Sequence, residues 1–202
     1  MSFVFKIKLD GSSRPSIWRK IVVGESISFR RLHLVIQAAM GWQNTHPYEF
    51  SLSDISSPWQ ITEKCTDSED VKPFVKSSLW GLEKGKFDAA KIKVNQFFNT
   101  VRQKLVYIYD FDDNWWHIVE LVEIRPDQLS RAFCLDGRGT CPPESCNGVG
   151  GYYFMVDAIN NPQHPGHRSM MRWIGLMETE TWNLDRFGND EIADVNHDLK
   201  IL

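Results

Sequence analysis

The chain of 202 residues lacks the features that would assign it to a class at once. No stretch approaches the roughly 20 consecutive apolar residues that a membrane-spanning helix needs, so we predict no membrane partner. The first nine residues alternate between apolar and polar side chains and do not form the unbroken apolar segment of a signal peptide. We therefore expect a cytoplasmic protein.

The sequence also lacks a surplus of positive charge. Lys and Arg number 23 against 26 Asp and Glu, which gives a net charge of −3. A protein that held duplex DNA mainly by neutralising phosphates would usually be basic. The partner stays open between a protein and a nucleic acid, and nucleic-acid binding would require a local patch of cations.

No Gly-rich phosphate loop, nucleophile elbow or HExxH motif occurs in the chain. What the sequence does contain is material for a large core: 42% hydrophobic residues, among them 8 Trp, 12 Phe and 5 Tyr. The composition therefore indicates a folded globular protein without naming a reaction.

Hydrophobic periodicity predicts one α+β domain over residues 1–202, with an antiparallel or mixed sheet and helices packed on it. Alternation predicts strands over 3–9, 16–23, 48–52, 59–61, 104–109 and 115–124. Ser28 as N-cap and Gly41 after the last turn predict a helix over 29–40. Shorter helices are expected at 77–82, 95–99, 152–160 and 165–176. The connection 62–86, the stretch 134–151 and the tail are expected to be largely irregular.

An acidic hairpin tip is the first candidate site. Asp110, Asp112, Asp113 and Asn114 precede His117, but Trp115 stands where a calcium loop needs glycine. Asp110, Asp113 and His117 could bind a metal ion or act as acid and base, with His33 or His46 converging on them. Alternatively, Asp110 and Asn114 bond the amides of the turn, and His117 fills a partly buried position.

A cysteine loop is the second candidate site. Cys134, Cys141 and Cys146 could supply three zinc ligands, although only the second spacing is typical of a structural site. The fourth ligand would come from one of four residues: His117, His164, His167 or Cys65. The alternative is a rigid Gly/Pro loop whose thiols pack as small apolar groups.

Arg168 and Arg172 form a smaller feature, one helical turn apart in the predicted helix 165–176. They could hold a phosphate or a carboxylate, or they could face water.

These motifs together resemble the plasmid pRiA-type ORF-3-like family. The resemblance covers nearly the whole chain and rests on three groups of residues: Ile17 to Arg19, Leu32, His33, 36–42, His46, Glu49 and Phe50; Tyr107, 109–111, Asp113, Trp115 and His117; and Cys134, Gly137, 141–144, Gly148, Gly151, Tyr152, Asn161, Pro162, His164, Pro165, Trp173 and Asn196. The resemblance implies an α+β roll, a plasmid or mobile-element context and no established enzyme activity.

The resemblance also adds Glu144, of the Cys-Pro-Pro-Glu segment, to the catalytic candidates. Three positions depart from the family pattern: Asp112 and Asn147 replace glycines, and Ser145 stands where Asp is frequent.

The sequence supports two functions. The first is a binding or regulatory module for a protein or a nucleic acid, because no known catalytic constellation is present. The second is a metal-dependent hydrolase that uses Asp110, Asp113 and His117. Zinc in the cysteine loop is the one cofactor that we expect.

Overall fold

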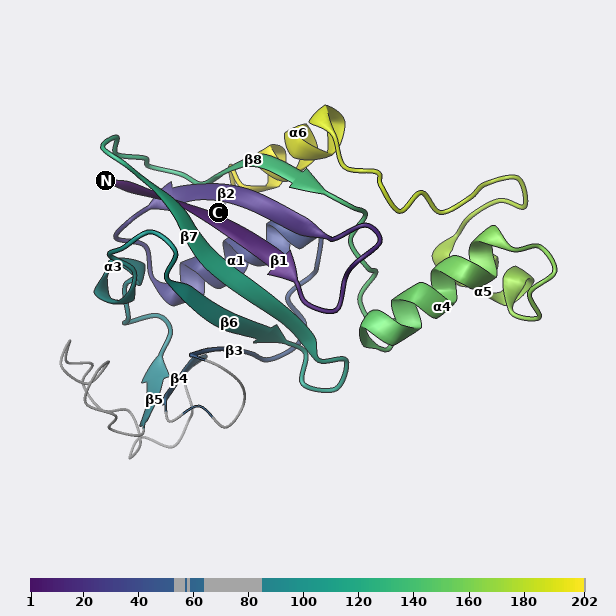
Figure 1. Ribbon diagram of the computed structural model, residues 1–202, viewed down its shortest axis with the longest axis horizontal. Helices are drawn as coiled ribbons and strands as arrows, with labels where there is room; N and C mark the ends of the chain where they lie inside the picture. Colours follow the sequence, from purple (N-terminus) through teal and green to yellow (C-terminus); the bar gives the residue numbers. More distant parts are fainter. Residues whose placement is uncertain (53–56, 58, 64–84, 202) are drawn as a thin grey trace.

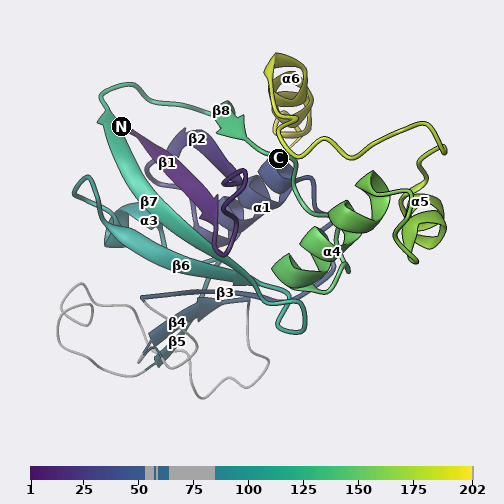
Figure 2. The same cartoon turned by 45° about the vertical axis from the view of Figure 1, so that its right-hand side comes forward.

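The computed structural model describes residues 1–52, 57, 59–63 and 85–201. This part of the chain forms one eight-stranded sheet in the order β5-β4-β3-β6-β7-β1-β2-β8, and the sheet curves around helix α1 (Figures 1 and 2). β4 and β5 run parallel, and the other neighbouring strands run antiparallel. The predicted α+β class with a mixed sheet is confirmed.

The strands and helices have the following bounds. The strands are β1 (Ser2–Leu9), β2 (Trp18–Gly24), β3 (Tyr48–Ser51), β4 (Trp59–Thr62), β5 (Gly85–Asp88), β6 (Lys104–Tyr109), β7 (Trp115–Arg125) and β8 (Phe133–Arg138). The helices are α1 (Phe29–Met40), α3 (Val94–Phe97), α4 (Gly148–Asn160), α5 (His167–Ile174) and α6 (Asn189–Asp198).

The core lies between α1 and one face of the sheet. In β1 the alternate residues Phe3, Phe5, Ile7 and Leu9 are all at most 2% exposed, because strand alternation turns every second side chain toward the helix. The opposite face of β1 carries Lys6 and Lys8, which alternate with these buried residues. This division of each strand into an inner and an outer face positions the candidate residues that the sheet carries.

Helix α1 has the predicted bounds because its ends are defined by side-chain chemistry. Ser28 Oγ accepts the backbone N–H of Arg31 at 3.2 Å, which satisfies one free donor of the first turn. Gly41 adopts φ 74°, a left-handed conformation that glycine reaches without strain, and its N–H bonds the last turn. The N–H of Trp42 also bonds the last turn, at the Gln37 carbonyl, at 3.0 Å.

Four expectations need correction. β5 was missed, and β8 lies in the stretch expected to be irregular; β8 is an edge strand with only Cys134 buried, so it shows no apolar alternation. α4 begins at Gly148, four residues before the predicted start. α6 was missed since Val195 is its one buried residue. The predicted helix 77–82 lies outside the described residues, as does most of the connection 62–86.

Helices α4 and α5 form an arm that projects from the sheet, and the chain returns from it to α6, which packs on β8 (Figures 1 and 2). Asn196 of α6 fixes this contact with two hydrogen bonds to the backbone of Cys134, at 2.8 and 3.0 Å. Within the described residues, no helix has the length and apolar character needed to cross a bilayer.

Candidate functional site

The tip of the β6–β7 hairpin is a turn that Asp110 organises with its own side chain. Its Oδ1 accepts the backbone N–H groups of Asp112 at 3.0 Å and of Asp113 at 3.3 Å. The backbone is left-handed at Asp110 and Asn114, with φ of 57° and 55°, a conformation that Asp and Asn tolerate best after glycine. These bonds match the turn-forming interpretation of Asp110.

The second carboxylate oxygen of Asp110 faces His46. Asp110 Oδ2 lies 3.6 Å from His46 Nε2, and the His46 side chain is 34% exposed. Tyr109 packs edge to face against the imidazole. An imidazole beside a carboxylate can transfer protons, but within the described chain no hydroxyl or thiol hydrogen-bonds the His46 ring.

His33 lies in a closed ring of four hydrogen bonds beneath this surface. Gln37 Nε2 donates to the Tyr107 hydroxyl, which donates to His33 Nδ1; His33 Nε2 donates to Asn44 Oδ1, and Asn44 N–H donates to Gln37 Oε1, with separations of 2.5–3.1 Å. Burial lowers the pKa of His33 to about 4, so its imidazole is neutral at pH 7. The ring joins α1, β6 and the loop after α1.

His117 points inward from β7 and is fully buried. Its Nδ1 donates to the Trp115 carbonyl at 2.9 Å, and its ring packs between Trp42 and Tyr107 at centroid distances of 5.4 Å. Burial lowers its pKa to about 4. Its Nε2 has no hydrogen-bond partner in the described structure. His117 is therefore a neutral core residue, more deeply buried than the sequence suggested.

Glu144 connects the cysteine loop to the loop after α1. The Tyr109 hydroxyl donates to Glu144 Oε1 at 2.5 Å and accepts the N–H of Thr45, while Glu144 Oε2 accepts the N–H of Gln43. Trp42 Nε1 donates to the Pro142 carbonyl at 2.8 Å. Burial, followed by the bond to Glu144, raises the pKa of Tyr109. Glu144 thus links the cysteine loop to Tyr109 at the end of β6 and to Gln43 in the loop after α1.

We name this hydrogen-bonded assembly the signature junction, because most of its members belong to the family pattern. Its residues are His33, Gln37, Trp42, Asn44, Tyr107, Tyr109 and Glu144.

The predicted catalytic residues are distributed over separate environments. Asp110 lies in the turn, His117 in the core and Glu144 in the signature junction, while Asp113 Oδ2 accepts the N–H of Asn147 at 3.2 Å. In the described residues no three His, Cys, Asp or Glu side chains are grouped to hold a metal ion. The convergence of Asp110, Asp113 and His117 on one ion is therefore not observed.

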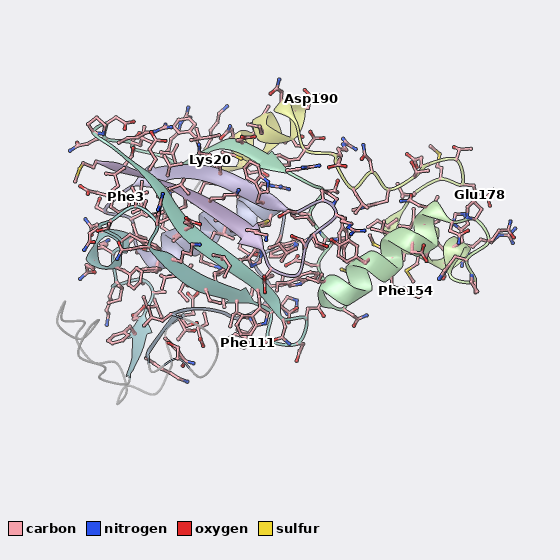
Figure 3. The ribbon with its side chains drawn as sticks, viewed as in Figure 1. Phe3, Lys20, Phe111, Phe154, Glu178 and Asp190 are labelled. Carbon is pink, nitrogen blue, oxygen red and sulfur yellow. The ribbon has the colours of Figure 1, made fainter. Side chains whose placement is uncertain are left out.

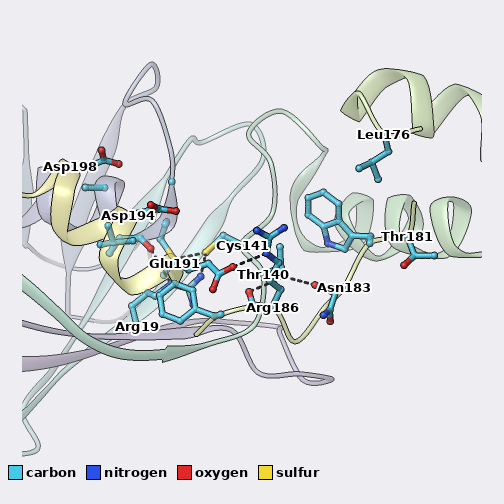
Figure 4. Close-up of a pocket in the computed structure, with 17 residues that line it drawn as sticks. Arg19, Thr140, Cys141, Leu176, Thr181, Asn183, Arg186, Glu191, Asp194 and Asp198 are labelled. Atoms are coloured by element: carbon cyan, nitrogen blue, oxygen red, sulfur yellow. Dashed lines mark hydrogen bonds and ion pairs between the residues drawn. The ribbon is translucent and has the colours of Figure 1, made fainter. Parts of the chain in front are cut away.

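The thiols of the cysteine loop each have a different partner. Cys134 Sγ approaches the Asp136 carbonyl at 3.7 Å and Cys146 Sγ the Gly148 carbonyl at 3.9 Å, whereas Cys141 Sγ lies 2.9 Å from Arg19 Nη2 (Figure 4). Burial raises the pKa of all three thiols, that of Cys146 to about 12. Protonated thiols with separate partners match the packed-loop alternative, and zinc binding stays a prediction.

The candidates for the fourth ligand also have other partners. His164 Nδ1 accepts the N–H of Gly166, and His167 Nδ1 donates to the Ala158 carbonyl. Cys65 lies outside the described residues.

Arg19 is a buried residue to which the sequence reasoning gave no role. It is 2% exposed, its N–H groups bond four backbone carbonyls and Cys141 Sγ, and Phe187 covers its guanidinium at 3.5 Å. The signal was present, because Arg19 stands between Ile17 and Ile21 on the inward face of its strand. Arg19 connects β2, the end of α1 and the cysteine loop.

Two departures from the family pattern lie where the cysteine loop meets the hairpin tip. Ser145 and Asn147 both adopt left-handed φ, of 61° and 62°, so the glycine usual at position 147 would suit this backbone. A Cβ on Gly148 would approach the Asp113 carbonyl to 2.4 Å, so only glycine allows the hairpin to come this close.

The outer face of the central strands carries a second candidate surface, which the sequence reasoning did not identify. Strand pairing aligns Asp136, Lys20, Lys6, Glu120 and Lys104 in one row across β8, β2, β1, β7 and β6, and Trp18, Lys8 and Ile118 in the next. Figure 1 looks onto this face with α1 behind the strands, and Figure 3 labels Lys20 on it. We name the set Lys6, Lys8, Trp18, Lys20, Lys104 and Trp116 the lysine face.

Comparisons with known proteins agree with the fold and do not name a reaction. A model of the family described as "Plasmid pRiA4b ORF-3-like protein" matches residues 1–191. The "Uncharacterized protein y4hQ" of Sinorhizobium fredii is 32% identical over 178 residues, covering 87% of this chain and 82% of that protein. The crystal structure of "Protein of Unknown Function MM3350" from Methanosarcina mazei Go1 is similar with a TM-score of 0.73 at 25% identity, covering 95% of this chain and 96% of that one.

Proposed function

We propose a function from the surface of the molecule, because this chain belongs to the plasmid pRiA4b ORF-3-like family and the compared relatives carry no assigned activity. The protein is a binding module that binds single-stranded nucleic acid on the lysine face. It acts in the cytoplasm and, as its family suggests, in plasmid or mobile-element biology.

The observation that carries the proposal is a pair of like charges. Lys6 lies directly opposite Lys20 in the β1–β2 ladder, an arrangement that destabilises a sheet. In the described chain the lysines with ion pairs are Lys91, with Asp88, and Lys104, with Glu120. Among the described residues Lys6, Lys8 and Lys20 form no ion pair, although Glu120 lies opposite Lys6 and Asp136 opposite Lys20 in the neighbouring strands. A bound phosphate chain would supply negative charge to these three lysines directly.

The aromatic residues of the same face favour nucleic acid over a simple anion. Trp18 and Trp116 are half-buried and flank the lysine rows, and the Lys6 ammonium lies 4.5 Å from the Trp18 ring. Bases stack on exposed aromatic rings of a sheet while lysines bind the phosphates, without preference for sequence.

The charge of the whole chain favours a single strand over a duplex. The net charge is −3, so the attraction to a nucleic-acid strand has to come from a local group of cations such as the lysine face. A row across four strands spans about 14 Å at the usual strand spacing, which suits one nucleic-acid strand lying across the sheet. Tight duplex binding would require more phosphate contacts than this row offers.

Fluorescence anisotropy with a labelled, mixed-sequence single-stranded oligonucleotide at low salt tests the proposal. We expect saturable binding by the unaltered protein. The triple variant Lys6→Gln/Lys8→Gln/Lys20→Gln should bind at least roughly tenfold more weakly, since phosphate contacts supply most non-specific affinity.

The matched control removes three lysines elsewhere, as Lys91→Gln/Lys93→Gln/Lys200→Gln, and should retain the original affinity. An equal loss in both triple variants would show that only net charge matters. Absence of saturable binding to the oligonucleotide would reject the proposal and would favour a protein partner.

A further inference from the structure

A cavity on helix α5 has a charge pattern that the proposed function does not use. Its volume is about 480 Å³, and its lining includes His167, Arg168, Met171, Arg172, Leu176 and Glu178. It lies on the projecting arm, where Figure 3 labels Glu178 at the end remote from the sheet. The sequence already placed Arg168 and Arg172 one turn apart, and the structure directs both into the wall of one cavity.

The two arginines are exposed and carry like charges one helical turn apart. Neither forms an ion pair within the described residues, although two like charges at this spacing destabilise a helix. Arg168 lies in the first turn of α5, near the positive end of the helix dipole. That turn contains no acidic residue, and its N-cap, Gly166, offers no side chain to the free N–H groups. Of the described residues that line the cavity, Glu178 alone carries a carboxylate.

A second cavity, of about 400 Å³ beside Arg19, shows the contrast (Figure 4). Arg186 is paired there with Glu191 at 2.7 Å, and the donors of Arg19 are bound to backbone carbonyls and to Cys141. Asp194 and Asp198 add negative charge to its lining. The cations in that cavity are paired or hydrogen-bonded, whereas the exposed arginines of α5 have no ion pair with any described residue.

We propose that the α5 cavity is a binding site for the phosphate group of a phosphate monoester. Arg168 and Arg172 present two planar guanidinium groups, which bind phosphate oxygens in bidentate fashion. Met171 and Leu176 supply apolar wall for the organic part of the ligand. His167 is held against α4 by the bond from its Nδ1 to the Ala158 carbonyl, which fixes that side of the site.

The phosphate monoester has two possible sources, a small metabolite or the 5′ end of a nucleic-acid strand. Titration calorimetry with phenyl phosphate and with inorganic phosphate, at constant ionic strength set by NaCl, tests the shared chemistry. We expect saturable binding that becomes at least roughly tenfold weaker in Arg168→Gln/Arg172→Gln. A second arm compares an oligonucleotide with and without a 5′-phosphate; a preference that this variant abolishes assigns the nucleic-acid source, and its absence assigns the small molecule.

Arg14→Gln/Arg102→Gln is the matched control, because it removes the same charge from two other exposed positions. The control should bind phenyl phosphate unchanged, and so should the triple lysine variant, which separates this proposal from the proposed function. Glutamine favours helix, so the circular dichroism and melting temperature of the α5 variant should match those of the parent. No saturable phosphate binding, or an equal loss in the arginine control, would overturn the inference.

Discussion

The signature junction and the lysine face lie on opposite sides of the same strands. The polar groups of the first are hydrogen-bonded to one another, whereas most lysines of the second form no ion pair among the described residues. Tyr107 and His117 point from β6 and β7 toward α1, while Lys104 and Trp116 point from the same strands outward. In the signature junction a ring of hydrogen bonds closes on itself, and the histidine in it is neutral. On the lysine face, three cations remain without an ion pair among the described residues.

From this difference we infer that the residues of the family signature mainly hold the fold together. Glu144, Tyr109 and Asp110 use their polar atoms on neighbouring backbone, so little capacity remains for a substrate. Buried polar networks that are fully bonded specify one arrangement of the chain. The lysines that form no ion pair among the described residues lie outside the signature, and Trp18 is the one member of the lysine face that belongs to it.

Acidification should lower the stability of the folded protein through the buried histidines of the inner face, while the lysines of the outer face remain charged. The pKa values of His33 and His117 are about 4 in the folded chain against 6.5 when unfolded, so the unfolded chain takes up protons first as pH falls below 6.5. Between pH 7 and pH 5 each histidine should remove about 2 kcal/mol of stability. Glu49 opposes this, because burial raises its pKa to about 7 and its neutral form gains on acidification.

The net loss for the unaltered protein should be about 2 kcal/mol, rising to about 4 kcal/mol in Glu49→Gln. Urea unfolding at both pH values measures it, with the exposed Glu178→Gln as the control that keeps the parent's pH dependence. A stability that rises from pH 7 to pH 5 would contradict the buried neutral histidines.

Removal of one hydroxyl should open the hydrogen-bonded ring. Tyr107→Phe leaves His33 Nδ1 and Gln37 Nε2 without a partner in the core, which should cost about 3 kcal/mol of unfolding free energy. Tyr153→Phe, whose hydroxyl accepts one bond near the surface, should cost about 1 kcal/mol or less. The oligonucleotide affinity of both folded variants should be unchanged. Equal losses from the two substitutions would show that the ring has no special role.

Truncation of an aromatic residue should separate stacking from charge on the lysine face. Trp116→Ala should weaken oligonucleotide binding by about 2 kcal/mol, the usual effect of one lost base stack. Trp173→Ala, at a 48% exposed position on the arm, should leave the affinity unchanged. If both tryptophans contribute equally, binding is not confined to the lysine face.

The smallest expected effect is on the stability of the sheet itself. Lys6→Gln removes the repulsion with Lys20 together with the weaker attractions to Glu120 and Trp18, so it should stabilise the free protein by at most about 0.5 kcal/mol. The same substitution at Lys91, which is paired with Asp88, should be neutral or slightly destabilising. A clear destabilisation by Lys6→Gln would mean that the like-charge pair is not strained.

Much of the fold follows from the sequence because its signals are local. Alternation gives β1, β6 and β7, and the caps at Ser28 and Gly41 bound α1. β8 and α6 could not be predicted, since each is a polar element held in place by the other through Asn196.

The surroundings of the candidate residues could not be predicted from the sequence, for a related reason. The sequence places Asp110 and His117 seven positions apart, but strand alternation and the turn give them different surroundings. The pairing of Lys6 with Lys20 depends on the register of the β1–β2 hairpin, which single residues do not reveal.

The salt dependence of oligonucleotide binding tests the central claim most directly. With three lysines that contact phosphates, the logarithm of the binding constant should fall against the logarithm of salt concentration with a slope of about −2. In Lys6→Gln/Lys8→Gln/Lys20→Gln the slope should approach zero, while Tyr107→Phe should keep it. A triple lysine variant that retains the parent's slope would contradict the account.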